Sequence, residues 1–267
     1  MADILSHRRN RARILREMSP VILMGRGHSG TRVLAWICTR LGIHLGTHPE
    51  RETGDADDLV FTRKIKKIAI RNIGIHRVDQ VRPRDLARFQ RAVHHHYVLQ
   101  GRPDLPWGWK FPETYLIAPH VHLTFPQARY LHLVRDGRDL AFKDHLTDDP
   151  RRALGRRLLN HIGALKDPHH LQAARSWAFQ VETYAAFRDH TRGLRIHDLR
   201  FEDLIRDPVP CTETVCAFLG IPFRPEAREW IEANIIEGKI QQHRDQAPER
   251  LREVEEAIGP TLQRFGY

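Results

Sequence analysis

The stretch PVILMGRGHSGTRVLAWICTRLG, at positions 20–42, constrains the fold of this chain more than any other. Residues 20–25 form an apolar run, which predicts a strand buried in a parallel sheet. Residues 29–42 have the apolar periodicity of a helix, and three glycines stand at positions 25 to 30. Such glycines let backbone amides approach an anion, and the helix that follows adds positive potential at its N-terminus. We therefore expect a strand, a phosphate-binding loop and a helix in this order.

The loop departs from that of nucleoside-triphosphate-binding proteins, whose pattern is GxxxxGK[ST]. Here Gly30 is followed by Thr31 and Arg32, so the lysine and the magnesium-binding hydroxyl after it are missing. A magnesium-dependent P-loop kinase is an alternative that the motif disfavours. A tight turn without a ligand is another, but the loop carries more glycines and donors than a turn needs. The predicted ligand-binding residues are Arg26, Gly27, His28, Ser29, Gly30, Thr31 and Arg32.

Strands alternate with helices along the rest of the chain, which is typical of an α/β protein. Further strands are predicted at 128–134 and 194–204, with a short extended piece at the start of 107–125. The fold class is therefore α/β, with a P-loop-like central parallel sheet flanked by helices. Because ligands of such sheets bind at the carboxyl ends of the strands, these ends are expected to converge. The predicted helices lie within 58–99, 107–125, 173–190 and 209–219, and beyond residue 224.

The bulk composition narrows the class of ligand and the compartment. A net charge of +10 favours an anionic ligand, and no aromatic-interleaved basic stripe indicates specific nucleic acid binding. Three cysteines form no disulfide framework, and Cys38 and Cys216 are expected in the core. No run of 18 apolar residues and no signal-peptide core is present. We predict a cytoplasmic protein, whose positive surface also suits a peripheral place at a membrane; the oligomeric state stays open.

A second segment, YLHLVRDGRDLAFKDH, carries candidate phosphate ligands at the end of a predicted strand. Arg135 can bind a phosphate through two hydrogen bonds, and Lys143 lies about two turns into the next helix. Asp136, Arg138 and Asp139 are expected to cap that helix and to brace Arg135. Taken alone, the segment would fit a surface salt-bridge cluster better than a ligand site.

Four segments together resemble a known family. They are GRGHSGTRVL at 25–34, WGWKFPETYLIAP at 107–119, LVRDGRDLA at 133–141 and LRFEDLIRDPVPCTETVCAFLGIPF at 199–223. In this order and spacing, the chain is similar to the sulfotransferases that use 3′-phosphoadenosine 5′-phosphosulfate, particularly the bacterial members. The resemblance covers residues 20 to about 223. It implies a single sulfotransferase domain over 1–267, with 50–100 and 147–172 as insertions on the acceptor side.

The resemblance implies how the donor is held. The first loop would bind the 5′-phosphosulfate end, with His28 where the family usually has a lysine or arginine, so that Arg26 or Arg32 would share its charge-neutralising role. Arg135 would bind the 3′-phosphate, with Lys143 in place of the usual serine. The basic residues Lys239 and Arg244 in EGKIQQHR are weaker candidates for the same phosphate. The product would be adenosine 3′,5′-bisphosphate, and no metal is implied because sulfuryl transfer needs mainly positioning and charge stabilisation.

The acceptor and its general base are less defined. The family transfers the sulfuryl group to a hydroxyl or an amine; a carbohydrate or glycolipid suits the positive chain. Lys110 is expected to point at the sulfuryl group, and His28 counts among the catalytic candidates. The base candidates, in order, are Glu52, Glu113 and Asp55. A non-catalytic nucleotide-binding module with the same fold is a further alternative, because His28 and Lys143 depart from the family pattern.

Several other residues have two interpretations. Glu202 and Asp203 look like acid–base groups, but a structural role is favoured. Trp107 and Trp109 fit an acceptor pocket and core packing equally well. His48 and His122 are conceivable bases, but a surface or packing role is favoured for each. The run His94 to His96 lacks the spacing of a metal site, and solvent exposure is its favoured explanation.

Overall fold

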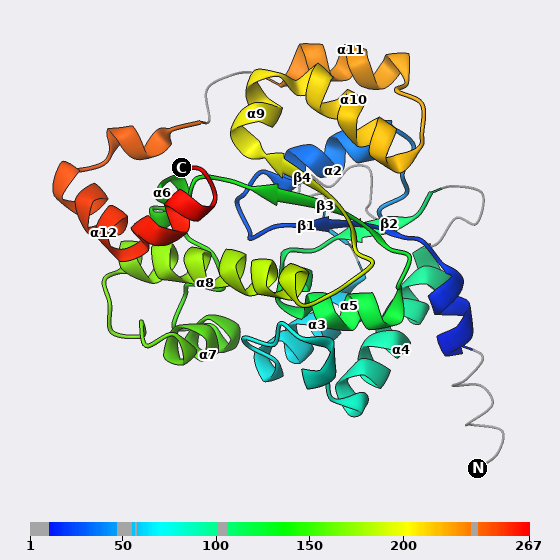
Figure 1. Ribbon diagram of the computed structural model, residues 1–267, viewed down its shortest axis with the longest axis horizontal. Coiled ribbons are helices and arrows are strands. Elements are labelled where there is room, and N and C mark those ends of the chain that lie inside the picture. Colours follow the sequence, from blue (N-terminus) through cyan, green and yellow to red (C-terminus); the bar gives the residue numbers. More distant parts are fainter. Residues whose placement is uncertain (1–10, 47–54, 57, 101–105, 236–239) are drawn as a thin grey trace.

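The computed structural model describes residues 11–46, 55–56, 58–100, 106–235 and 240–267. At its centre is a four-stranded, wholly parallel sheet in the order β2-β1-β3-β4. The strands are β1 (Val21–Met24), β2 (Gly108–Lys110), β3 (Arg129–Val134) and β4 (Arg195–Arg200). Each lies within a segment expected to be extended, and helices flank the sheet on both sides (Figure 1). The predicted fold class is confirmed.

One face of the sheet is covered by helices that pack on Val21 and Leu23 of β1. Their buried side chains include Leu34, Val215 and Ile231. In Figure 1 this layer lies above the strands. It consists of α2 (Thr31–Arg40), α9 (Phe201–Arg206), α10 (Pro208–Leu219) and α11 (Pro225–Asn234).

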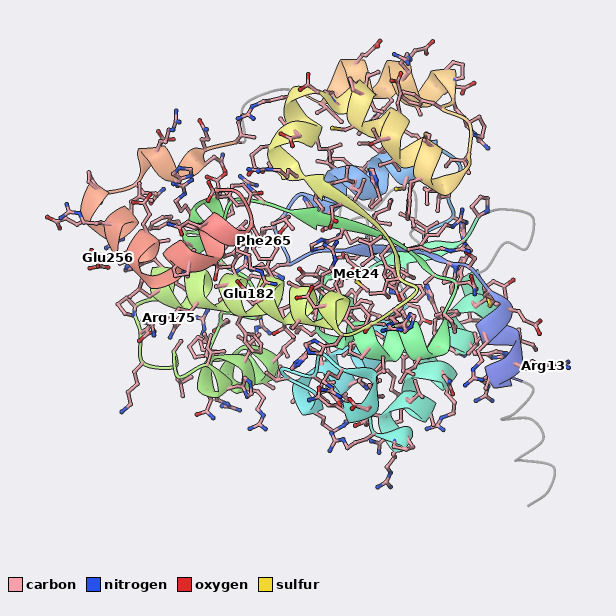
Figure 2. The ribbon with its side chains drawn as sticks, viewed as in Figure 1. Arg13, Met24, Arg175, Glu182, Glu256 and Phe265 are labelled. Atoms are coloured by element: carbon pink, nitrogen blue, oxygen red, sulfur yellow. The ribbon has the colours of Figure 1, made fainter. Side chains whose placement is uncertain are left out.

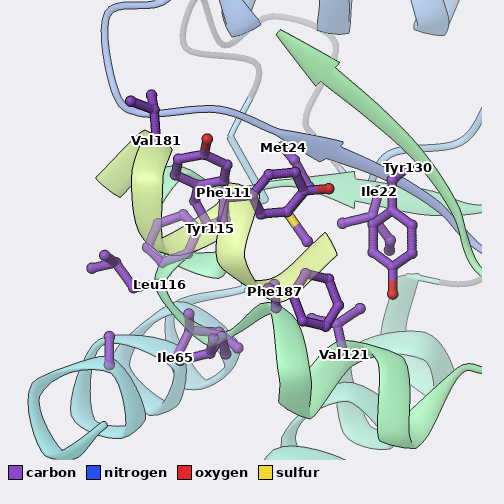
Figure 3. Packing of buried hydrophobic residues seen from close by; sticks show 14 of the residues in the cluster. Ile22, Met24, Ile65, Phe111, Tyr115, Leu116, Val121, Tyr130, Val181 and Phe187 are labelled. Atoms are coloured by element: carbon purple, nitrogen blue, oxygen red, sulfur yellow. The ribbon is translucent and has the colours of Figure 1, made fainter. Parts of the chain in front are cut away.

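The opposite face of the sheet carries the larger of the two hydrophobic clusters. Ile22 and Met24 of β1 point into this cluster (Figure 3). Side chains of successive strand residues alternate between faces, so one short strand contributes to both cores. Each such fully buried side chain stabilises the fold by about 1.5–3 kcal/mol relative to exposure. This layer consists of α3 (Leu59–Arg71), α4 (Pro83–Gln100), η2 (Pro112–Ile117), α5 (Ala118–Thr124), α7 (Ala153–His161), α8 (His169–Asp189) and α12 (Pro248–Arg264).

An N-terminal helix at 11–17 and three short elements complete the described chain. The short elements are η1 (Val78–Gln80), α6 (Gly137–Ala141) and η3 (Gln242–Asp245). Helix starts follow the capping residues in the sequence. The Asp58 carboxylate accepts from Val60 N at 2.8 Å and caps α3, and Asp136 accepts from Arg138 N at 2.9 Å and caps α6. Figure 2 shows Met24 within the molecule, whereas Arg13 projects from a peripheral helix.

Two interpretations need adjustment. The segment 147–172, expected as an insertion on the acceptor side, also contributes to the core, since Leu154 and Leu158 of α7 are buried there. His96 is not solvent-exposed: it is fully buried and stacks on Phe61 with ring centroids 4.4 Å apart. Exposure explains only its neighbour His95. No helix of the described residues is long and apolar enough to cross a membrane.

Candidate active site

A cleft of about 400 Å³ opens at the carboxyl edge of the sheet. The loop after β1, the end of β2 and the residues directly after β3 and β4 all contribute to it. The expected convergence of strand ends is therefore observed. Its lining residues are Gly27, His28, Gly30, Thr31, Arg32, Val33, Trp36, Asp55, Lys110, Pro112, Arg135, His145 and Phe201.

The loop after β1 presents backbone amides at the start of α2. Gly30 has a left-handed φ of 90° and precedes the helix, whose first turn has no side-chain cap. A side chain at Gly30 would also collide with Phe201, because an added Cβ would lie 2.1 Å from its Cδ2. The uncapped amides of α2 and the Thr31 hydroxyl are thus available to an anion in the cleft.

Arg26 does not line this cleft. Its side chain is fully buried and forms an ion pair with Asp148, which is also fully buried. Arg26 Nη1 additionally donates to the carbonyl of Gly27 at 3.0 Å. Ser29 is buried as well and lies outside the lining, while Arg32 is exposed on the cleft wall. Of the arginines in the loop, the geometry therefore favours Arg32 as the one that meets a ligand.

His28 adopts a left-handed φ of 68°, which is uncommon for a residue other than glycine. Its Nε2 lies 2.8 Å from the carbonyl oxygen of Asp144, so Nε2 carries the donated proton. Burial is the main cause that lowers the pKa of His28, and the nearby Arg26 and Lys143 add to it. In the empty protein the lowered pKa favours the uncharged ring at this position.

Arg135 is held at the cleft by a buried network. Its guanidinium donates to Asp139 Oδ2 from Nη2 at 2.7 Å and from Nε at 3.2 Å, and it stacks 4.3 Å over the Phe201 ring. Asp139 also accepts from His243 N at 3.0 Å and lies 2.7 Å from its Nδ1. Burial opposes ionisation of Asp139, but the hydrogen bonds from His243 and Arg135 outweigh it and lower its pKa to about 2. The expected bracing of Arg135 by Asp139 is observed.

The segment η3 reaches the same place from far along the chain. Gln242 Oε1 accepts from Lys143 Nζ at 2.8 Å and lies 3.5 Å from Arg135 Nη2. Arg244, in the same turn, is exposed and does not line the cleft. Lys239 lies outside the described residues. The C-terminal segment therefore contacts the Arg135 group through Gln242 and His243, which the sequence reasoning missed because neither carries a fixed charge.

Lys110 enters the cleft from the end of β2. Its Nζ lies 2.5 Å from Asp55 Oδ1, and the residue is 4% exposed. Burial lowers the pKa of Lys110, while Asp55 opposes this shift. Glu113 is 1% exposed, does not line the cleft and lies 3.5 Å from Lys66 Nζ. Burial raises the pKa of Glu113 to about 6 although Lys66 acts against it.

Of the three predicted base candidates, only Asp55 lines the cleft. Glu52 lies outside the described residues, as does His48. The sequence reasoning did not single out His145, although it stands two residues after Lys143 and lines the cleft. Its only signal was its position as the last residue of the segment YLHLVRDGRDLAFKDH.

For the other residues with both a functional and a structural interpretation, the observed contacts support the structural one. Glu202 accepts from Asp136 N and from the Tyr267 hydroxyl, both at 3.0 Å. Trp107 and Trp109 are buried in the core, and Trp36 is the tryptophan in the cleft lining. His122 is partly buried beside Phe187, at a centroid distance of 6.3 Å.

A parallel sheet with a glycine-rich loop between its first strand and the helix that follows defines a P-loop-like α/β protein. The model of the sulfotransferase family matches residues 20–225, which is most of the chain, and the chain therefore belongs to the sulfotransferase family. A 3-alpha-hydroxysteroid sulfotransferase from Cavia porcellus is 26% identical over 145 residues, which are 49% of this chain and 46% of that protein. The chain thus spans less than half the length of this curated relative.

Solved structures share the fold. A sulfotransferase from Mycobacterium avium superposes with a TM-score of 0.56 at 14% identity, covering 98% of this chain and 80% of its own. A mouse sulfotransferase complexed with PAP gives a TM-score of 0.50 at 15% identity, with 91% and 84% covered. At these identities the likeness concerns the fold alone.

Proposed function

We propose that the protein transfers a sulfuryl group from 3′-phosphoadenosine 5′-phosphosulfate to a hydroxyl or amine acceptor. The observation that carries the proposal is the cleft, where the loop after β1, Lys110 and Arg135 line one cavity of about 400 Å³. Membership of the sulfotransferase family and the PAP held by the mouse structure support this donor. A carbohydrate or glycolipid acceptor is part of the same proposal, as are a single domain and a cytoplasmic location.

In this proposal, different residues of the cleft bind the two ends of the donor and stabilise the transferred group. The amides of Gly27 to Thr31 and the Arg32 guanidinium would bind the 5′-phosphosulfate. Arg135, pre-oriented by Asp139, would bind the 3′-phosphate. Lys110 would stabilise the charge that develops on the sulfuryl oxygens and on the bridging oxygen as it leaves. We place the acceptor on the side of segments 50–100 and 147–172, since Asp55 lies at that wall.

Nucleotide binding tests the proposal against its alternatives. We expect adenosine 3′,5′-bisphosphate at 100 times its Kd to stabilise the fold by about 2.7 kcal/mol, a rise in Tm of roughly 5–10 °C. ATP with magnesium should give no such rise, and EDTA should not abolish the bisphosphate effect. A rise with ATP and magnesium alone would favour the kinase. No rise with either nucleotide would refute the sulfotransferase proposal. Bisphosphate binding without any sulfate release from the donor would favour a non-catalytic module.

The 3′-phosphate role of Arg135 makes a second prediction. Replacing Arg135 by alanine should weaken adenosine 3′,5′-bisphosphate binding by about 10- to 100-fold, because charge-assisted hydrogen bonds to the phosphate are lost. Binding of adenosine 5′-monophosphate, which lacks the 3′-phosphate, should change little. Isothermal titration calorimetry measures both constants. The neighbouring Arg138→Ala is the control, since that guanidinium pairs with Asp136 and Glu255. An unchanged preference for the bisphosphate in Arg135→Ala would contradict the assignment.

A further inference from the structure

His145 stands on the wall between two cavities. It lines the cleft described above, and it also lines a second cavity of about 400 Å³. The second cavity is built mainly from the chain just after α6, with Asp144, Asp149, Arg151 and Arg152 among its lining residues. A group at this position can contact a molecule in either space.

The imidazole lies flat against the loop after β1. A Cβ added at Gly27 would fall 2.0 Å from Nε2, 2.4 Å from Cδ2 and 2.6 Å from Cε1 of His145. These nearly equal distances place that point over the face of the ring. The in-plane lone pair of Nε2 is therefore not directed at Gly27. Any side chain at position 27 would collide with the His145 imidazole, so glycine is required there for the imidazole to pack against the loop.

The opposite ring nitrogen is held by a chain of hydrogen bonds. His145 Nδ1 lies 2.7 Å from Thr147 Oγ1, and Thr147 Oγ1 donates to Asp148 Oδ1 at 2.9 Å. Asp148 is ionised because it is the counter-charge of the buried Arg26, whose guanidinium stays protonated. The threonine proton thus points to Asp148, and His145 Nδ1 must supply the proton of the 2.7 Å bond. Thr147 N also donates toward Nδ1 at 3.3 Å, and this longer bond competes with the 2.7 Å bond for the same nitrogen.

The shorter of the two bonds, to Thr147 Oγ1, favours a proton on Nδ1. With the proton on Nδ1, Nε2 is an unprotonated acceptor. Among the described residues none forms a hydrogen bond with Nε2, and its ring meets His28 edge to face at a centroid distance of 5.5 Å. The arrangement is that of a general base whose orientation is set by a hydrogen-bonded partner behind it.

We propose that His145 Nε2 is the general base of the transfer and that the acceptor enters from the second cavity, an inference that rests on the proposed sulfotransferase function. The acceptor oxygen forms a bond to the sulfur of the donor as the bond from sulfur to the bridging oxygen breaks. The electron pair of that bond remains on the 5′-phosphate of adenosine 3′,5′-bisphosphate. The acceptor proton passes to Nε2 and leaves to water after the products depart.

The charges around His145 make its pKa depend on whether the donor is bound. Burial is the main cause that lowers its pKa to about 2 in the empty protein, and the cations Arg26, Lys66 and Lys110 add to the effect together with His28. The donor brings several negative charges into this cationic cleft. Its charge opposes that of the cations and raises the pKa of His145. Donor binding therefore acts on the charge contribution to the pKa of His145, while the contribution of burial remains.

The lining of the second cavity indicates the class of acceptor. The carboxylates of Asp144 and Asp149 accept hydrogen bonds, and the guanidinium groups of Arg151 and Arg152 donate them. Hydroxyl groups do both, so a polyhydroxylated acceptor such as a carbohydrate can satisfy these side chains. Asp149 already accepts from Arg151 at 2.9 Å, and both arginines are exposed, so acceptor hydroxyls would add to these ion pairs rather than replace missing partners. The volume lies in the range of small-molecule sites.

Sulfate release from the donor, with water as the acceptor, tests the base. His145→Gln should lower this rate by about 10²-fold or more, while the Kd of adenosine 3′,5′-bisphosphate stays within about threefold of the parent. Free imidazole should partly restore the rate of His145→Ala. Thr147→Val should lower the rate of sulfate release, whereas Thr147→Ser should release sulfate at close to the parental rate. Serine keeps the hydroxyl that accepts the hydrogen bond from His145 Nδ1, and valine removes it. His190→Gln is the control, since His190 lines neither cavity.

Each outcome has a distinct meaning. Failure of the parent to bind the bisphosphate would refute the proposed function itself. A His145→Gln variant that binds the bisphosphate and releases sulfate at the parental rate would overturn the base but leave the function intact. Nitrogen-15 NMR of the imidazole needs no turnover: the proton should reside on Nδ1, and the bisphosphate should raise the pKa of His145. A proton on Nε2 of the free protein would overturn the proposal.

Discussion

Replacing Lys110 by methionine is expected to slow sulfuryl transfer by about 10²- to 10³-fold, the loss typical for one preorganised donor in an active site. Lys110 ends β2 with its side chain 5% exposed, so its charge acts where little water screens it. The interaction strengthens as charge moves to the bridging oxygen, so the loss should fall on kcat rather than on nucleotide affinity. Sulfate release and the Kd of adenosine 3′,5′-bisphosphate measure the two effects.

The pH dependence of the same reaction reports on the charge of Lys110. Burial lowers the pKa of Lys110 despite the nearby Asp55. The ammonium therefore loses its proton at a lower pH than an exposed lysine does, and kcat/KM should fall as pH rises through this lowered pKa. Lys110→Arg should move that fall to higher pH, because a guanidinium keeps its proton.

Lys67→Met is the matched control, since Lys67 is exposed on α3 and lines no part of the cleft. It should leave rate and affinity unchanged. Should Lys110→Met release sulfate as fast as the parent, then Lys110 does not stabilise the transferred group, and Arg32 becomes the candidate for that role.

The architecture could be predicted because its signals are local. The four hydrophobic residues of β1, between a proline and a glycine, indicate a buried strand, and the glycines after it indicate the loop. Asp58 and Asp136 mark helix starts by the same local chemistry. Arg135 could be placed at the cleft because carboxyl ends of parallel strands share one edge of a sheet.

The direction of each side chain could not be predicted, because it depends on partners far along the chain. Arg26 is in the phosphate-binding loop, yet it turns inward because Asp148, more than a hundred residues later, offers a buried counter-charge. Gln242 reaches Lys143 in the same way. His145 gains its place from the absence of a side chain at Gly27. Residue type and order contain none of these contacts.

The ion pair of Arg26 and Asp148 should make Asp148→Asn one of the most destabilising substitutions in the chain, with a loss of about 3–5 kcal/mol in the free energy of unfolding. Both side chains are fully buried, and the substitution leaves a guanidinium that cannot lose its proton. Urea unfolding measures the loss as a lower midpoint at an unchanged slope. Arg26→Met/Asp148→Leu should recover part of it, because that pair of changes removes both charges.

Arg26→Met alone should cost less than Asp148→Asn, since a carboxyl group can become neutral by taking up a proton. Burial raises the pKa of Asp148 even with Arg26 beside it, and removal of the arginine raises it further. A raised pKa means that the folded state holds the proton more tightly than the unfolded chain does. The penalty in Arg26→Met should therefore be small at acid pH and grow as pH rises through that pKa. Equal midpoints for Asp148→Asn and the parent would contradict a desolvated pair and remove the anchor of the hydrogen-bond chain that orients His145.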